Sequence, residues 1–303
     1  MKPPSHPAPA PVVACFGELL WDCLPRGIFP GGAPANVAYH LARQGLRARP
    51  VSAVGRDFLG DELLRRLAAA GVDPRFIARL ADRPTGTVRA ALDRNGSPTF
   101  TIHRAVAWDR IPVPRRRRSH PPAAVVFGTL ALREPANRRA LAALLAAWPS
   151  ALRVADLNLR PPFDSPKVID LVLGQAQLLK LNDSELRRVA GKFPATPAGR
   201  ERAVTRLGRR HGLSRVCVTA GAHGAGLWWD GSWHWEKARP VDIRDTIGAG
   251  DAFLAGLLAA LLRRRQPPRA ALAHACRMGE FVASRDGSMP PYRCDSRGRP
   301  VEM

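Results

Sequence analysis

The chain has 303 residues, 46% of them hydrophobic, which is enough for one large domain with an ordinary core. No apolar run is long enough to cross a membrane, and the proline-rich start, residues 1–11, lacks the apolar core of a secretory signal, so we expect this start to be disordered. Lysine and arginine outnumber aspartate and glutamate by 47 to 25, a net charge of +22 that raises the question of nucleic-acid binding.

The positive charge comes mainly from arginine, and the arginines are scattered over the whole chain. Only residues 115–118 form a tight run, and no aromatic side chains interleave with this run to stack on bases. We interpret the charge as a solvated surface with one basic loop, and we expect no specific nucleic-acid partner. The five cysteines lack metal-ligand spacing, so free thiols in a reducing cytoplasm fit best.

The first predicted strand covers residues 12–20 and is followed at once by Trp21 and Asp22. Open α/β sheets bind ligands beyond the carboxyl ends of their strands, which is where this prediction places Asp22. Asp22 is therefore a candidate for hydrogen bonding to a substrate, although an ordinary loop aspartate would look the same. A glycine turn then becomes a helix up to residue 44, and Asn36 near its start can donate and accept hydrogen bonds.

A hairpin is predicted next, from strands at residues 85–91 and 98–103 with the turn Asp93-Arg94-Asn95-Gly96 between them. It follows a second strand at residues 49–55 and a helix at residues 61–70, so it interrupts the alternation of strands and helices. The hairpin could be a plain antiparallel edge or part of a separate small sheet.

From residue 123 onward, strands and helices alternate. The predicted strands cover residues 123–128, 153–158, 178–182 and 215–220, and the predicted helices cover residues 137–148, 167–173, 183–190, 199–211 and, near the end, 270–283. This alternation predicts an α/β fold with a mainly parallel sheet and helices on both faces. Right-handed crossovers would bring the carboxyl ends of the strands, and so the site, to one edge.

Polar groups follow three of these strands. Asp156, Asn158 and Arg160 alternate, so they would share one side if the strand geometry persists. Asn182 and Glu185 have the spacing of an N-cap and N3 pair at a helix start. A glycine-rich turn from residue 219 to 226 follows the last strand, but it lacks the Gly-Lys-Ser/Thr of a Walker A loop.

The stretch from Asp245 to Asp251 reads Asp-Thr-Ile-Gly-Ala-Gly-Asp and leads into an apolar helix at residues 252–262. Free amide groups and the helix dipole at such an N-terminus favour an anion, and Gly248 and Gly250 would let the backbone approach it. Asp251 puts a carboxylate beside this anion site, which suits a general base that deprotonates a hydroxyl attacking a phosphate. A simple helix cap is the alternative interpretation of Asp251.

This stretch closely resembles the C-terminal signature of the PfkB (ribokinase-like) family of sugar and nucleoside kinases. A second match, Gly31-Gly32-Ala33-Pro34-Ala35-Asn36-Val37-Ala38 with its continuation to Gly60, resembles the N-terminal signature of that family. Ala107-Trp108-Asp109 and Asp156-x-Asn158-x-Arg160 resemble segments of its fructokinase-like branch. The resemblance implies a ribokinase-like α/β fold with a kinase domain over residues 12–291, a small β lid from about residues 22–30 and 84–108, and a C-terminal tail at residues 292–303.

The resemblance also implies an activity: transfer of the γ-phosphate of ATP to a primary hydroxyl of a sugar, with fructose as the expected acceptor. Asp251 would be the general base, and Gly248, Ala249 and Gly250 would form an anion hole. Substrate contacts are expected from Asp22, Gly31, Gly32, Asn36, Arg104, Asn158 and Arg160. Nucleotide contacts are expected from Lys180, Thr219, Gly221, Gly224, Gly248 and Gly250.

Metal ions and partners are implied in the same way. Mg²⁺ would be held through water by Asn182 and Glu185, which could still cap a helix, and a monovalent cation such as K⁺ by Asp245 and Ser288. A homodimer through the lid is also implied. Three alternatives stay open: another kinase of the family, acting on 2-keto-3-deoxygluconate, ribose or a nucleoside; a non-catalytic protein that binds nucleotide or sugar; and a nucleic-acid-binding protein, which rests on charge alone.

Overall fold

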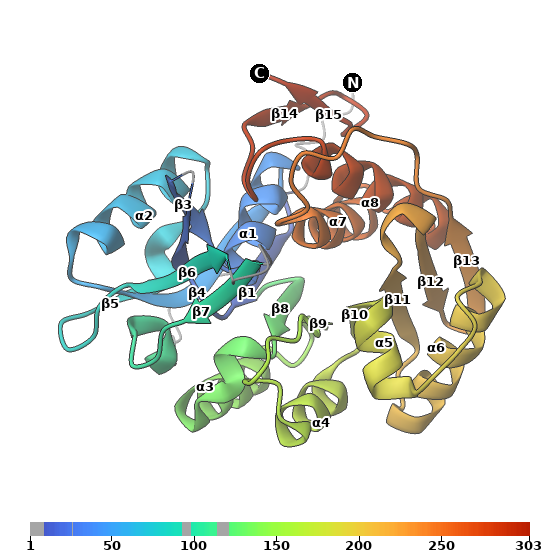
Figure 1. Cartoon of the computed structure of the whole chain (residues 1–303), viewed down its shortest axis with the longest axis horizontal. Coiled ribbons are helices and arrows are strands. Elements are labelled where there is room, and N and C mark those ends of the chain that lie inside the picture. The colour runs from blue at the N-terminus through green and yellow to red at the C-terminus, as the bar shows by residue number, and fades with distance from the viewer. Residues whose placement is uncertain (1–8, 26, 93–97, 114–120) are drawn as a thin grey trace, which may run out of the picture.

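The structure is a computed structural model that describes residues 9–25, 27–92, 98–113 and 121–303. The strands of its main sheet are β1 (Val12–Phe16), β4 (Arg47–Gly55), β5 (Ile77–Leu80), β8 (Ala124–Gly128), β9 (Leu152–Asp156), β10 (Leu178–Asn182), β11 (Arg215–Thr219), β12 (Ala225–Trp229) and β13 (Ser232–Glu236). They lie in the order β13-β12-β11-β10-β9-β8-β1-β4-β5 (Figure 1). Neighbours from β11 to β5 pair in parallel, whereas β12 and β13 add antiparallel pairs at one edge.

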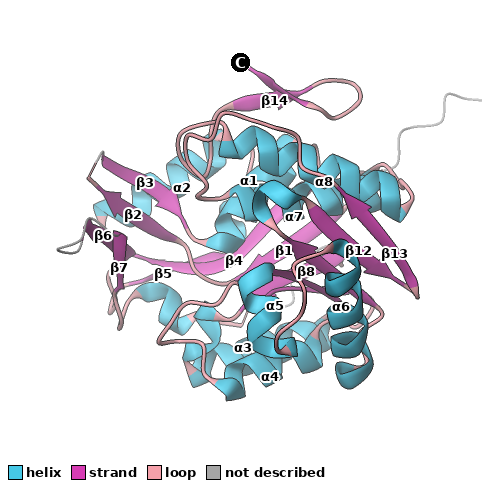
Figure 2. Cartoon of the chain, turned by 45° about the vertical axis from the view of Figure 1, so that its right-hand side comes forward, coloured by secondary structure: helices cyan, strands magenta, loops and turns pink. Residues whose placement is uncertain are grey.

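Helices cover both faces of this sheet (Figure 2). One layer consists of α1 (Ala33–Arg43), α2 (Phe58–Ala69), α7 (Ala249–Leu258) and α8 (Pro268–Ala283). The other layer consists of α3 (Pro135–Ala147), α4 (Pro166–Gln175), α5 (Asp183–Ala190) and α6 (Pro197–His211). The predicted α/β class, with a mainly parallel sheet and helices on both faces, is confirmed.

Strand β1 shows how the sequence produces two cores. Val13 and Cys15 point into the core under α1, α2, α7 and α8, whereas Ala14 and Phe16 point into the core over α3 to α6. Successive side chains of a strand face opposite ways, so a strand buried on both faces needs a continuous apolar run. This is why β1 could be read from the sequence as a central strand.

A second, smaller sheet lies beside β4 and β5 (Figure 1). It contains β2 (Leu20–Leu24), β3 (Gly27–Gly31), β6 (Gly86–Leu92) and β7 (Pro98–Ile102), in the order β3-β2-β6-β7. The antiparallel pairing of β6 with β7 confirms the predicted hairpin, whose turn lies outside the described residues. Because β6 also pairs in parallel with β2, the hairpin belongs to a separate sheet and is not an edge of the main one.

The prediction of one strand over residues 12–20 was wrong. Strand β1 ends at Phe16, and Gly17 then adopts a φ of 148°, where the chain leaves the main sheet. Strand β2 starts at Leu20 in the second sheet, so Asp22 lies inside a strand and not in a loop beyond one. Glycine tolerates this backbone angle, whereas a larger residue would be strained.

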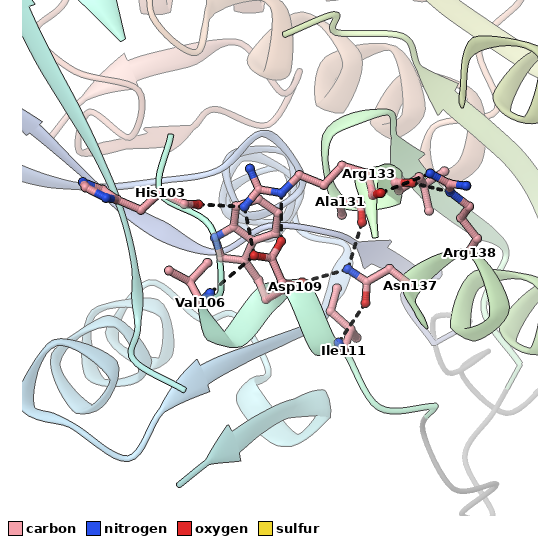
Figure 3. A network of polar contacts seen from close by, with 10 residues as sticks. His103, Val106, Asp109, Ile111, Ala131, Arg133, Asn137 and Arg138 are labelled. Atoms are coloured by element: carbon pink, nitrogen blue, oxygen red, sulfur yellow. Dashed lines mark hydrogen bonds and ion pairs between the residues drawn. The ribbon is translucent and has the colours of Figure 1, made fainter. Parts of the chain in front are cut away.

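A polar network joins the second sheet to the main body (Figure 3). The Arg133 guanidinium binds both carboxylate oxygens of Asp109 at 2.9 and 3.0 Å and donates to the carbonyl oxygen of His103, just after β7, at 2.7 Å. It also lies over the rings of Trp108 and Phe163, 4.2 and 4.5 Å from their centroids. The side chains of Arg133 and Asp109 are both buried, so this is an internal ion pair.

Two hairpins were not predicted from the sequence. Strands β12 and β13 are joined by Asp230 and Gly231, both with positive φ, a two-residue turn that Asp-Gly favours. Near the end, β14 (Tyr292–Cys294) pairs with β15 (Pro300–Glu302), and the buried Tyr292 packs against Tyr39 of α1. Within the described ranges, no helix has both the length and the hydrophobicity to cross a membrane.

Candidate active site

A cavity of about 1090 Å³ lies between the second sheet and the carboxyl edge of the main sheet. Leu20, Asp22 and Val88 line it from the second sheet, while Asn182 and Thr219 line it from the ends of β10 and β11. The predicted site residues that line this cavity are Asp22, Gly32, Asn36, Asn158, Arg160, Lys180, Asn182, Thr219, Gly221, Asp245, Gly248, Gly250 and Asp251. The structure therefore brings together residues that are up to 229 positions apart, from Asp22 to Asp251.

The N-terminus of α7 faces this cavity. Gly248 is the N-cap residue and has a left-handed φ of 79°, and a Cβ added there would lie 2.6 Å from the Cβ of Ser288. Only glycine fits both the angle and the contact. Helix α7 starts at Ala249, so Gly250 and Asp251 belong to its first turn, where unpaired amide groups are available to an anion.

Asp251 is buried at the bottom of the cavity, with 8% of its surface exposed. Its Oδ2 accepts a hydrogen bond of 2.7 Å from Nδ2 of Asn36. Burial and the nearby Asp156 carboxylate raise the pKa of Asp251 to about 7, although Lys180, Asn36 and Arg160 oppose this shift. A carboxyl group with a pKa near neutrality can accept a proton and release it again at physiological pH.

A buried ion pair lies next to this helix start. Nζ of Lys180 in β10 is 3.1 and 3.0 Å from the two carboxylate oxygens of Asp156, which is its register partner in β9. A Cβ added at Gly250 would lie 3.0 Å from the same Nζ, so the ammonium group is beside the first turn of α7. Burial lowers the pKa of Lys180, but Asp156, Glu185 and Asp251 outweigh burial and the pKa is raised, so this lysine is charged.

The segment after β9 departs from the predicted geometry. The strand ends at Asp156, and Asn158 has a positive φ of 39°. The expectation that Asp156, Asn158 and Arg160 share one side of a strand was therefore wrong. Asp156 turns to Lys180, whereas Asn158 and Arg160 line the cavity. The backbone turn after Asp156 separates a structural carboxylate from two residues that can reach a ligand.

Asp22 projects into the cavity from β2, next to Gly31 of β3. A Cβ at Gly31 would lie only 2.0 Å from Oδ2 of Asp22, so the carboxylate occupies the space that this glycine leaves open. Burial raises the pKa of Asp22 to about 6; Arg160 opposes the shift and Asp245 adds to it. Gly31 itself does not line the cavity, and its contribution is this room for Asp22.

Glu18 also lines the cavity, and sequence reasoning gave it no role. It is buried, its Oε1 accepts a hydrogen bond of 3.3 Å from the amide of Ala33 at the start of α1, and burial raises its pKa. The signal in the sequence was a carboxylate between an apolar strand and a glycine turn. Arg244, directly before the stretch from Asp245 to Asp251, is a second lining residue to which sequence reasoning assigned no role.

Arg104 is not among the lining residues. Its side chain is exposed, and its guanidinium lies 5.4 Å from the centroid of the Phe163 ring. Ile102, the last residue of β7, does line the cavity, while the side chain of Phe100 falls outside the described part of the chain. At the end of β7 the second sheet therefore presents the apolar Ile102 to the cavity, and the positive charge of Arg104 lies outside it.

Asn182 and Glu185 form the predicted capping box of α5. Oδ1 of Asn182 accepts from the Glu185 amide at 2.9 Å, and Oε2 of Glu185 accepts from the Asn182 amide at 2.8 Å. Oε1 of Glu185 accepts from the amide of Leu159, also at 2.8 Å. In the described ranges, no group of three His, Cys, Asp or Glu side chains could hold a metal directly. Oδ1 of Asn182 also accepts from the Ser184 hydroxyl at 2.6 Å, which uses both of its lone pairs, and Glu185 lines neither cavity. The two residues can therefore reach an ion such as Mg²⁺ only through its water shell.

Asp245 and Ser288 lie in two loops that are bonded to each other. The Asp245 carboxylate accepts from the amide of Ile247 at 2.9 Å and from that of Gly287 at 3.1 Å. The carbonyl oxygen of Ser288 is 2.9 Å from Nε2 of His40, and its hydroxyl donates to the carbonyl oxygen of Pro30 at 3.3 Å. These bonds fix the loop that carries Gly248.

A second cavity of about 500 Å³ adjoins the first beyond the α7 start. The two cavities share Thr219, Gly221, Thr246 and Gly250. Two further predicted residues, Gly224 and Ala249, line only this second cavity. An elongated ligand with an anionic middle part could therefore extend from one cavity to the other past the N-terminus of α7.

Comparison with known proteins gives a consistent match. Residues 15–293 match the model of a family described as pfkB family carbohydrate kinase. A fructokinase from Klebsiella pneumoniae is 33% identical over 305 residues, which cover 92% of this chain and 96% of that protein.

Solved structures agree with this match. A Vibrio cholerae fructokinase in a fructose, ADP and calcium ion bound form is similar with a TM-score of 0.77 and 26% identity, over 92% of this chain and 94% of that one. Aminoimidazole riboside kinase from Salmonella enterica, complexed with aminoimidazole riboside and an ATP analog, is similar with a TM-score of 0.75 and 25% identity, over 92% and 95%.

Proposed function

Since the chain belongs to the pfkB family of carbohydrate kinases and is a sugar phosphotransferase, we propose that it transfers the γ-phosphate of ATP to a primary hydroxyl of fructose. The observation that carries the proposal is the buried Asp251 at the N-terminus of α7, with a pKa raised to about 7. The similarity to fructokinases supports fructose as the acceptor.

The reaction is an in-line displacement. The hydroxyl oxygen of the sugar attacks the γ-phosphorus, the bond from that phosphorus to the bridging oxygen breaks, and ADP leaves with the bonding electrons. Asp251 takes the hydroxyl proton, and its hydrogen bond from Asn36 fixes the orientation of the carboxylate. We assign the stabilisation of negative charge on the transferred group to the amides of Gly248, Ala249 and Gly250; the amide of Ala249 also donates to the carbonyl oxygen of Thr246 at 3.3 Å.

Other residues of the cavity orient the two substrates. Asp22, Asn36 and Asn158 offer acceptors and donors to sugar hydroxyls, and Arg160 offers charge to the transferred phosphate. Lys180 lies beside Gly250, where its ammonium adds positive charge under the phosphates.

We assign the metal contacts by the same reasoning. Asn182 and Glu185 would hold Mg²⁺ through water, and this ion would neutralise charge on the phosphates. A monovalent cation near Asp245 and Ser288 would share their oxygens with the hydrogen bonds that these residues already accept.

A nucleoside is the second candidate acceptor, because the similar Salmonella enterica kinase was solved with aminoimidazole riboside. The experiment that separates the candidates is acceptor-dependent ADP release from Mg·ATP with fructose, ribose, 2-keto-3-deoxygluconate, adenosine and aminoimidazole riboside. We expect fructose to give the highest kcat/KM.

The control for this panel is Asp251→Asn, which keeps the shape of the side chain and removes the base. We expect a loss of at least about 10²- to 10⁴-fold in kcat with ATP binding retained. Near-normal turnover by the variant would refute the role of Asp251, and faster turnover on a nucleoside would replace fructose as the acceptor.

A further inference from the structure

The second cavity has the properties of a site for a flat, largely apolar group. Phe253, Val241 and Ile243 are among its lining residues. Val241 and Ile243 are 38% and 63% exposed, so two large apolar side chains stand open to solvent at this cavity. The cavity also adjoins the N-terminus of α7, where the phosphates are proposed to lie. A nucleobase attached to those phosphates would cover the apolar side chains.

One carboxylate interrupts this apolar lining. Of the described residues that line the cavity, Glu280 alone carries an acidic side chain, and Arg239 is the other charged one. Glu280 projects from α8, four positions after Cys276, which lines the same cavity from the same helix face. Thr219 and Thr246 add hydroxyl groups, but Glu280 is the one carboxylate among the described lining residues, and a single charged acceptor in a largely apolar lining is typical of a group that sets ligand specificity.

The Glu280 carboxylate is held in place by the protein. Oε1 accepts a hydrogen bond of 2.8 Å from the amide of Arg239, and Oε2 forms an ion pair of 3.0 Å with Nε of Arg277. Arg277 is fixed in turn by Glu236, 3.1 Å from its Nη2. A carboxylate has about four acceptor positions and cannot donate when ionised, so roughly two positions remain for a donor from a ligand.

We propose that Glu280 selects the phosphate donor by accepting a hydrogen bond from the exocyclic amino group of adenine. The inference rests on the proposed kinase function, because it takes the second cavity as the nucleobase site. A donor without the amino group leaves the half-buried carboxylate with an unmet acceptor on the side that faces the ligand. Guanine carries a carbonyl oxygen at the same ring position, and two acceptors facing each other repel, so GTP is disfavoured as well.

The test compares three donors with the purified full chain at a saturating concentration of the best acceptor. They are ATP, purine riboside triphosphate (ATP without its amino group) and GTP. Hydrogen bonds to charged groups are worth enough for a preference of about 10- to 100-fold, so we expect kcat/KM for ATP to exceed both others by that factor. In Glu280→Ala the preference of ATP over the deaminated analogue should fall to about threefold or less.

Glu236→Ala is the matched control. Glu236 is also paired with Arg277 but does not line the cavity, so this variant should keep the preference for ATP. If Glu280→Ala does not fold, Glu280→Gln replaces it, since its amide oxygen can still accept from Arg239 while its amide nitrogen disfavours an amino group.

Equal use of ATP and the analogue by the unmodified chain would overturn the proposal, as would a Glu280→Ala variant that still discriminates. If no donor supports acceptor-dependent release, the kinase proposal fails by itself. In that case the thermal shifts given by ATP and by the analogue decide the role of Glu280: a larger shift with ATP that Glu280→Ala abolishes supports it, and equal shifts refute it.

Discussion

Two buried charges of opposite sign act on the carboxyl group of Asp251. Asp156 disfavours its ionised form by repulsion, and Lys180 favours the ionised form by attraction. Both belong to neighbouring strands and are bonded to each other, so neither can move away when Asp251 changes charge. The pKa of Asp251, the proposed base, is therefore set by the sheet under α7 as well as by its own burial.

The pH dependence of the reaction follows from this pKa. Below pH 7 Asp251 is mainly protonated and cannot accept the hydroxyl proton, and above pH 7 it is mainly ionised. We expect kcat/KM for the sugar to rise by about tenfold per pH unit on the acid side and to level off near pH 7 to 8. A profile already flat from pH 5 upward would show that the base has an ordinary carboxyl pKa.

Substitution of the two neighbours should move this profile in opposite directions. Asp156→Asn removes the repulsion and should shift the acid limb to lower pH, while Lys180→Met removes the attraction and should shift it to higher pH. Both variants should also lower kcat, because Lys180 loses its partner or its charge. The measurement is kcat/KM for the sugar from pH 5 to 9.

Asp164→Asn is the control for these shifts. Asp164 is a buried carboxylate paired with Arg188 and lines neither cavity, so its loss should lower stability without moving the limb. If the acid side of the pH profile lies at the same pH in all three variants, the Lys180–Asp156 pair stabilises the fold but does not set the pKa of Asp251.

At the scale of elements, the start of α5 combines a cap with a proposed metal contact. The Asn182 side chain accepts from the backbone amide of Glu185 and also lines the cavity. Asn182→Ala should lower the free energy of unfolding by about 0.5–2 kcal/mol, as expected for a lost N-cap. If Asn182 also contacts the hydrated metal, the variant should raise KM for Mg·ATP and the Mg²⁺ concentration for half-maximal rate.

Thr196→Ala separates the two effects. Thr196 caps α6, where its Oγ1 accepts from the Gly199 amide at 3.1 Å, and it lines neither cavity. Denaturant unfolding should give a similar loss for both variants, whereas only Asn182→Ala should change the Mg²⁺ dependence. If both variants have the same KM for Mg·ATP and the same Mg²⁺ dependence, Asn182 only caps the helix and does not contact the metal.

The sequence predicted an element well when the interactions that form it lie within a few residues of one another, and poorly when they join distant parts of the chain. Helix α5 and strand β10 have the predicted bounds, because a capping box and an apolar run of strand length act within a few residues. The division of residues 12–20 into β1 and β2 was not predictable in this way, because it depends on pairing of β2 with β6, more than 60 positions later. The β12–β13 hairpin did have a local signal, Asp230-Gly231.

At the scale of the whole molecule, the predicted strand alternation was sufficient to expect the candidate site at the carboxyl edge of the main sheet, where the structure has its cavity of about 1090 Å³. It could not show which residues share that edge in detail. The pairing of Lys180 with Asp156 depends on the register of β9 with β10, and the burial of Glu18 depends on the start of α1. Such contacts arise from tertiary packing, which a periodic pattern in the sequence does not encode.

The link between the two sheets also became visible only in the structure. Arg133 lies just after the main-sheet strand β8 and binds Asp109 and the carbonyl oxygen of His103, which follow β7 of the second sheet (Figure 3). Trp108, under the guanidinium, also packs against Gly86 at the start of β6, where a Cβ would lie 2.3 Å from its Nε1. Arg133 therefore anchors the ends of two strands of the second sheet, which lines one side of the cavity.

Loss of Arg133 should weaken both stability and sugar binding. Its side chain is 2% exposed and that of Asp109 is 3% exposed, so Arg133→Met leaves a buried carboxylate without its partner. Removal of one partner from a buried pair costs about 3–5 kcal/mol, which denaturant unfolding would measure. Because the second sheet loses its anchor, KM for the sugar should rise more than KM for ATP.

The double variant Arg133→Met with Asp109→Leu tests the cause of that loss. Replacement of both charges by apolar side chains removes the unpaired carboxylate, and such replacements are often neutral or stabilising, so most of the lost stability should return. The hydrogen bond to His103 stays absent in the double variant, so KM for the sugar should remain raised. If KM recovers together with stability, the anchoring of β7 through His103 is not what holds the second sheet over the cavity.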